Sequence, residues 1–157
     1  MRWSLLSLTR VSLTRVGLAI LPMLHAPVAS AESRPELSKH IEQVMPKVIS
    51  WRRDIHQHPE LSNREVRTAA KVAAHLEKLG LEVRTGIAHT GVVGILKGGK
   101  EGPVVALRAD MDALPVTEQT GLPFASKVVS EFNGQQTGVM HACGHDAHVA
   151  MLMGAAE

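Results

Sequence analysis

Apolar residues recur along residues 35–58 at the three- and four-residue steps of an amphipathic helix. The stripe consists of Leu37, Ile41, Val44, Val48, Trp51 and Ile55. Pro46 lies inside it and predicts a kink or a later start of the helix, because proline lacks the amide hydrogen that a helix interior uses. His58-Pro59 predicts the end of the helix, since a residue before proline is biased away from helical backbone angles.

A second helix is expected to open at residues 62–65 and to run to about Leu79. Ser62-Asn63-Arg64-Glu65 has the pattern of a capping box, in which a serine and a glutamate satisfy free amides at a helix start. The buried face of this helix is predicted to contain Val66, Ala69, Ala70, Ala73, Leu76 and Leu79. Gly80 follows as a typical C-terminal stop.

Short strands are predicted next. Residues 81–86 and 91–97 each have the pattern of a strand, with a polar turn between them. Residues 103–108, PVVALR, form a short apolar run of the kind that a central strand carries. This run delivers Asp110 and Asp112 at its C-terminal end, which is where ligands bind in open α/β sheets.

The last part of the chain has a mixed pattern. Residues 113–137 contain turn-forming glycine, proline and asparagine, and we expect them to be irregular or hairpin-like. An apolar helix is expected from Ala147 to Glu157.

The first 31 residues have the three parts of a secretory signal peptide. The parts are three arginines (Arg2, Arg10 and Arg15), an apolar run from Val16 to Leu24, and the small-residue end Val28-Ala29-Ser30-Ala31. The apolar run is far shorter than the roughly 20 residues that span a bilayer, which favours a cleaved leader over an uncleaved anchor. We therefore expect cleavage after Ala31 and an exported protein, periplasmic or secreted, whose mature part is residues 32–157.

The charge balance argues against nucleic acid as a partner. The chain has 17 Lys and Arg residues and 15 Asp and Glu residues, and three of the basic residues lie in the leader. The mature part is therefore almost neutral, and aromatic residues make up only 3% of the chain. Since it shows neither a basic stripe nor an aromatic platform, we expect no nucleic-acid partner, and no membrane partner once the leader is removed.

Candidate chemistry centres on Cys143, the only cysteine. A single cysteine forms no intramolecular disulfide, so it is a buried hydrophobe, a reactive thiol or a metal ligand. His145 follows after one glycine, and a glycine lets the backbone turn tightly enough for both side chains to face one point. Thiolate, imidazole and carboxylate groups are the usual zinc ligands, although this spacing also occurs by chance.

The neighbouring polar residues have alternative explanations. Asp110 and Asp112 are either part of the site or turn residues at a strand end. His148 is more often a packed or capping histidine than a ligand, and His141 is expected to support a ligand rather than to bind metal. An aspartate beside a histidine ligand can orient the second ring nitrogen of that histidine.

A second polar group consists of His56, His58 and Glu60. Two histidines two residues apart on a helix do not share a face. From the residues alone, this group is interpreted as a solvated helix end.

Three segments together resemble a known family of metallo-amidohydrolases. They are WRRDIHQHPELSNRE (51–65), LRADMDALPV (107–116) and MHACGHDAHVAMLMGAA (140–156). These motifs are similar, in the same order, to those of hippurate hydrolases, indole-acetyl-amino-acid hydrolases and N-acyl-amino-acid deacylases, relatives of the aminoacylases and zinc carboxypeptidases. The resemblance covers Val48 to Glu157.

The resemblance implies the fold and the site. The fold would be α/β: the N-terminal part of a metallo-exopeptidase-like catalytic domain, with a mixed sheet, helices on both faces and two divalent metal ions (Zn, Mn, Co or Ni). Carried over by position, Cys143 and His145 would be metal ligands, and Asp112 would be the catalytic aspartate that supports the site. Asp110 stands where related enzymes carry a ligand histidine, and it would lie near the metals without that role.

The resemblance also implies the reaction, hydrolysis of the amide bond of an N-acyl-amino acid or short peptide. A metal-activated water, with its pKa lowered to about 7, would attack the carbonyl while a glutamate moves the proton. That glutamate, further ligands and a lid that often forms a homodimer come later in the family than the position of Glu157. We therefore expect these 157 residues to be inactive alone. The alternative is a non-catalytic, exported metal-binding fragment.

Overall fold

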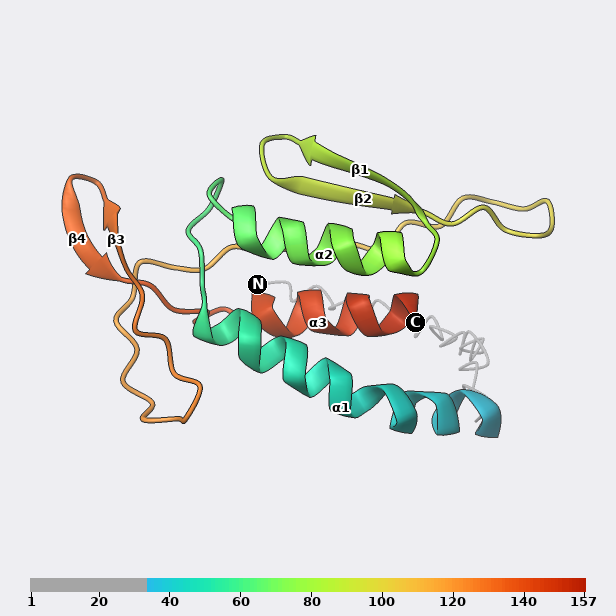
Figure 1. Cartoon of the computed structure of the whole chain (residues 1–157), viewed down its shortest axis with the longest axis horizontal. Helices are drawn as coiled ribbons and strands as arrows, with labels where there is room; N and C mark the ends of the chain where they lie inside the picture. Colours follow the sequence, from blue (N-terminus) through green and yellow to red (C-terminus); the bar gives the residue numbers. More distant parts are fainter. Residues whose placement is uncertain (1–33) are drawn as a thin grey trace, which may run out of the picture. The chain divides into compact units, whose positions relative to one another are not determined.

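The computed structural model describes residues 34–157. Its elements, in chain order, are α1 (Pro35–Gln57), α2 (Val66–Lys78), β1 (Glu82–Ile87), β2 (Gly91–Ile95), β3 (Val129–Phe132), β4 (Gln135–Gly138) and α3 (His145–Ala156) (Figure 1). The predicted signal peptide of residues 1–31 lies outside the described residues. No helix in residues 34–157 has the length and apolar character that a membrane crossing requires.

Helix α1 confirms the first predicted helix and starts at its expected position. Pro46 lies inside the helix, so a late start is wrong. The apolar stripe is buried only in part: Val44 and Ile55 are buried, whereas Leu37 and Ile41 are about half exposed. The reason is length, because α1 has 23 residues and its partner α3 has only 12, which cover part of the stripe.

Helix α2 starts later than predicted, and the capping box is wrong. Ser62 makes no cap, and Glu65 instead accepts a hydrogen bond from the amide of Asn63. The free amides of Arg67 and Thr68 donate to the two carboxylate oxygens of Glu60, each at 2.8 Å. Glu60 is therefore the N-terminal cap of α2, supplied from outside the helix.

The later start also changes the buried face of α2. Val66 is 69% exposed and Ala70 is exposed, against the prediction, whereas Thr68 is fully buried. At the other end, Gly80 has a φ of +80°, which confirms it as the left-handed residue that stops the helix.

Helix α3 lies between α1 and α2, and the hairpin of β1 and β2 lies on the far side of α2 (Figure 1). Ile55 of α1 forms the main core cluster with Val149 and Met153 of α3. Gly154 allows the close approach of the two helices, since a Cβ there would lie 2.5 Å from Val48 Cγ2. The core that supports the site is thus mainly a helix-on-helix contact.

The strands form two separate antiparallel hairpins. β1 pairs with β2, as the two predicted strands require, and β3 pairs with β4 in the region expected to be hairpin-like. Asn133 and Gly134 make the turn of the second hairpin, with φ values of +52° and +76°. The mixed α/β composition is confirmed, but no single sheet with helices on both faces is present in residues 34–157.

The predicted central strand at residues 103–108 is wrong. This segment forms no strand, and Val104, Val105 and Leu107 are 97%, 79% and 68% exposed. An apolar run becomes a strand only when neighbouring backbone pairs with it. Within the described residues β2 pairs only with β1 and β3 only with β4, and the run at residues 103–108 pairs with neither hairpin.

Backbone hydrogen bonds hold Ala113 and Leu114, which follow this run, to Glu60 on one side and to Met140 on the other. The amide of Ala113 donates to the carbonyl of Glu60 at 2.8 Å, and Leu114 exchanges two 3.0 Å backbone hydrogen bonds with Met140. Ala113 also packs with Leu61 and Val139 in a second core cluster. These contacts bring residues 110–114 beside the start of α3.

Candidate metal centre

Three side chains gather where this segment meets α3. Asp110, His145 and His148 each offer one ligand atom, and these atoms lie within 4.8 Å of one another. His145 and His148 stand three residues apart in the first turn of α3, which puts them on one face, and their ring centroids are 5.4 Å apart. Carboxylate oxygen and imidazole nitrogen are donors that divalent metals such as zinc accept, so this group fits a metal ion.

The alternation of residues 109–113 explains how the aspartates reach the site. Ala109 and Met111 pack against the main core cluster, and Ala113 belongs to the second cluster. Asp110 and Asp112 alternate with these apolar residues and are only partly buried. The two-residue period of an extended backbone therefore directs both carboxylates away from the core.

Asp112 holds the ring of His145. His145 Nδ1 lies 2.9 Å from the backbone oxygen of Asp112 and 2.9 Å from its Oδ1. Nδ1 must carry a proton to donate to these oxygens, which leaves Nε2 as the nitrogen with a free lone pair. A carboxylate that fixes a histidine in this way is the usual support for a metal ligand. The structure thus places Asp112 where it acts on His145.

Asp110 is kept ionised. Arg108 donates from Nη2 and Nε to Asp110 Oδ1, at 2.7 and 3.0 Å. This guanidinium lowers the pKa of the Asp110 carboxyl below its usual value. The ionised form is the one that binds a cation, and the position of Asp110 beside His145 and His148 agrees with the expectation that it lies near the metals.

Cys143 lies on the same turn as His145 but is not one of the three grouped side chains. Its thiol is free and exposed. Gly144 between the two residues has a φ of +90°, a left-handed conformation that glycine adopts without strain. The tight turn that the sequence predicted is therefore present, and the ligand role of Cys143 stays a prediction.

A buried polar cluster lies directly behind this turn, and the sequence missed it. It contains His56 and Arg52 of α1, Asp146 of α3 and Glu118 from the connecting segment. His56 is 3% exposed, so the interpretation of this residue as part of a solvated helix end is wrong. His58 is exposed, as expected, and Glu60 has the capping role described above.

His141 lies next to this cluster, with its ring centroid 6.4 Å from that of His56. It is 4% exposed, and neither ring nitrogen has a hydrogen-bond partner. Burial lowers the pKa of His141 to about 4, and this effect outweighs the attraction of Asp146 and Asp112, which raises the pKa. The ring is therefore neutral near pH 7.

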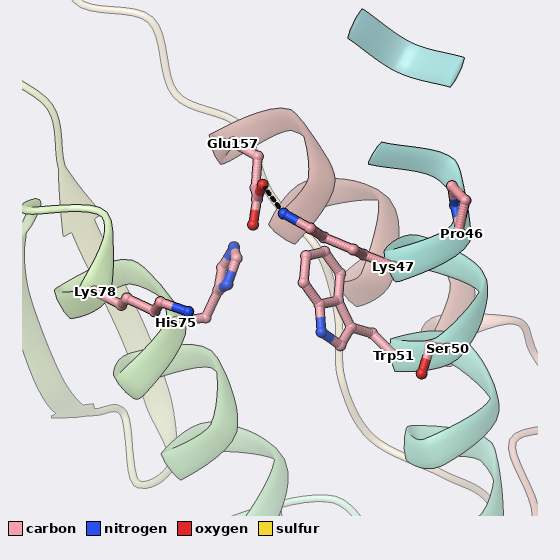
Figure 2. A pocket seen from close by; sticks show the side chains of 7 residues that line it. All are labelled: Pro46, Lys47, Ser50, Trp51, His75, Lys78 and Glu157. Atoms are coloured by element: carbon pink, nitrogen blue, oxygen red, sulfur yellow. Dashed lines mark hydrogen bonds and ion pairs between the residues drawn. The ribbon is translucent and has the colours of Figure 1, made fainter. Parts of the chain in front are cut away.

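A cavity of about 460 Å³ lies elsewhere, beside α1, α2 and the end of α3 (Figure 2). It is lined by Pro46, Lys47, Ser50, Trp51, His75, Lys78 and Glu157. Lys47 Nζ lies 2.6 Å from Glu157 Oε2 across it. None of the candidate ligands lines this cavity, so it is separate from the metal centre.

The fold and the site together define a mixed α/β segment that carries a group of side chains able to hold a metal ion. Residues 106–157, which contain all the candidate ligands, match the model of the peptidase family M20/M25/M40. This part of the chain belongs to that family.

Individual relatives agree with this assignment. The chain is 52% identical over 122 residues to thermostable carboxypeptidase 1 of Saccharolobus solfataricus, covering 77% of this chain and 29% of the relative. It is 44% identical over 125 residues to the N-acyl-L-amino acid amidohydrolase of Geobacillus stearothermophilus, covering 80% and 32%.

A solved structure gives the same picture. The YXEP protein of Bacillus subtilis, described as a dinuclear metal binding peptidase from the M20 family, is 47% identical, with a TM-score of 0.62 over 71% of this chain and 29% of that one. The chain thus spans about 29% of the length of such relatives.

Proposed function

We propose that this chain supplies metal ligands to an amidohydrolase that cleaves the amide bond of N-acyl-amino acids or short peptides. The observation that carries the proposal is the His145–Asp112 pair beside Asp110, in the part of the chain that matches the M20 family. The names of two relatives, an N-acyl-L-amino acid amidohydrolase and a carboxypeptidase, support amide substrates of this kind.

Each residue has a proposed task. His145 binds metal through Nε2, because Asp112 occupies Nδ1. Cys143, on the same glycine turn, is a second ligand, and its thiolate adds the soft donor that zinc binds well. Asp112 is a positioning residue, since it acts through His145. Asp110 adds negative charge that attracts the cation.

The metal contributes the chemistry that side chains lack. When bound, a divalent ion provides an activated water near neutral pH and polarises the amide carbonyl. Two ions per site are proposed from the dinuclear relative, and zinc, manganese, cobalt and nickel all suit these donors. Export of the protein is also a proposal, based on the leader pattern of residues 1–31.

A chimera tests the reaction directly. The aligned 125 residues of the Geobacillus stearothermophilus amidohydrolase are replaced by those of this chain, and hydrolysis of an N-acetyl-L-amino acid is measured with zinc or manganese. We expect turnover, and we expect His145→Ala to abolish it together with bound metal. His58→Ala is the matched control, because His58 is exposed and contacts Asp54 rather than the site.

Two results argue against the proposal. A His145→Ala chimera with unchanged metal content and turnover would show that His145 is not a ligand. A folded chimera that binds metal and hydrolyses no amide would favour the alternative, a non-catalytic metal-binding chain.

A further inference from the structure

We infer that Asp146 is a positioning residue for the metal centre: together with His56 and Arg52, it fixes the first turn of α3 and thereby the backbone that carries His145. This inference rests on the proposed function, since it takes His145 as a metal ligand. Asp112 holds the ring of His145, whereas Asp146 holds the turn itself, so the two supports act on different parts of the ligand.

The contacts of Asp146 converge on one oxygen. Asp146 is 1% exposed, and its Oδ2 accepts from Arg52 Nε at 2.7 Å and lies 2.8 Å from His56 Nδ1. Both partners belong to α1, which is 90 or more positions away in the sequence. This single carboxylate therefore fastens the start of α3 to another helix at the residue next to His145.

The other ring nitrogen of His56, Nε2, also has a carboxylate partner. His56 Nε2 lies 3.1 Å from Glu118 Oε1, and Glu118 also accepts hydrogen bonds from the Thr120 hydroxyl and the Ser126 amide. The imidazole is thus fixed between two carboxylates and cannot rotate without losing a partner. A network with all its members paired is rigid, which is the property that a ligand-bearing turn needs.

Burial explains why this network is more than a set of surface ion pairs. Two carboxylates and an imidazole are expensive to remove from water, and pairing among themselves and with the partly exposed Arg52 offsets part of that cost. The side chains of His56, Glu118 and Asp146 are at most 3% exposed. This costly buried cluster lies directly behind the candidate ligands. Its position indicates that it holds the ligands in place.

Cobalt(II) binding by the full 157-residue chain tests the inference without any turnover assay. Asp146→Asn keeps the shape of the side chain and removes its charge. We expect the affinity for cobalt(II) to fall at least about tenfold, the usual effect of losing a residue that supports a ligand. The visible absorption of bound cobalt should also change, while the helical circular dichroism is retained.

The matched control is Asp54→Asn. Asp54 also lies on α1 and also pairs with two cations, Arg67 and Lys71, at 2.7–2.8 Å, but it does not contact α3. We expect its cobalt affinity and spectrum to equal those of the unaltered chain. If Asp146→Asn fails to fold, Arg52→Gln replaces it, because Arg52 is partly exposed and its loss removes only one partner of Asp146. Arg52→Lys should restore part of the affinity.

The outcomes separate the two claims. If the unaltered chain binds cobalt, His145→Ala removes it, and Asp146→Asn and Arg52→Gln leave affinity and spectrum unchanged, then the positioning role is wrong and the proposed function stands. If the unaltered chain binds no cobalt, both the proposed ligand set and the positioning role are overturned. A loss of affinity in both variants, with Asp54→Asn unaffected, supports the inference.

Discussion

Glu60 is expected to stabilise α2 although it lies outside that helix. Its two carboxylate oxygens accept from the amides of Arg67 and Thr68, both at 2.8 Å. Glu60→Gln keeps one acceptor and turns the other into a donor, so it removes one hydrogen bond, about 1 kcal/mol, and the interaction of a negative charge with the helix N-terminus, about 0.5 kcal/mol. We therefore expect a loss of about 1.5 kcal/mol of unfolding free energy.

Urea unfolding followed by circular dichroism measures this loss. With a slope of about 1.5 kcal/mol per molar urea, the midpoint should fall by on the order of 1 M. Ser62→Ala is the decisive comparison, because the capping-box pattern assigns the cap to Ser62 and the structure gives it no capping contact. We expect a change within about 0.5 kcal/mol for Ser62→Ala. A larger loss for Ser62→Ala than for Glu60→Gln would refute the assignment.

Three further predictions follow from single contacts. Asp112→Asn should lower zinc affinity about tenfold in a competition titration, because the ring of His145 loses its charged partner. Gly154→Ala should lower the unfolding free energy by about 1–2 kcal/mol in urea despite the better helix propensity of alanine, because the new methyl group meets Val48 Cγ2 at 2.5 Å. With a chelator present, unfolding free energy should fall by about 2 kcal/mol from pH 7 to pH 5, because the pKa of His141 is about 4 in the folded chain and about 6.5 when unfolded.

The sign of the pH effect follows from proton uptake. The unfolded chain binds a proton at residue 141 between pH 6.5 and 4, while the folded chain does not, so stability is present above pH 6.5 and is lost as pH falls. His141→Leu should flatten this dependence, and an unchanged slope of unfolding free energy against pH would contradict the role given to His141.

For the contact between α1 and α3, adding Val48→Ala to the Gly154→Ala variant should restore its stability. For Asp112→Asn, equal zinc affinity would show that Asp112 does not support His145.

The sequence pattern predicted those elements whose stabilising contacts join residues that are close in sequence. Helix α1 and the hairpin of β1 and β2 lie where periodicity and turn residues placed them. The cap of α2 was missed because its acceptor, Glu60, lies seven and eight residues before the amides it binds, beyond the three-residue spacing of a capping box. The burial of His56 was missed for a stronger reason: its partner Asp146 is 90 positions away.

The site was predicted in part. Spacing suggested Cys143 and His145, the resemblance implied a supporting role for Asp112, and the structure brings Asp112 onto His145. The sequence did not show that Asp110 and His148 lie within ligand distance of His145, because only packing shows that the segment of Asp110 runs beside the first turn of α3. The strand expected at residues 103–108 failed because hydrophobicity alone does not show whether a pairing strand is at hand.

X-ray absorption at the zinc edge, on the zinc-loaded chain, tests most directly whether this turn is a metal centre. The account predicts imidazole scatterers at about 2.0–2.1 Å and a sulfur at about 2.3 Å, the distances typical of histidine and cysteine ligands. Cys143→Ser should remove the sulfur, and His145→Ala should remove an imidazole. A shell of oxygen atoms alone, unchanged by either substitution, would contradict it.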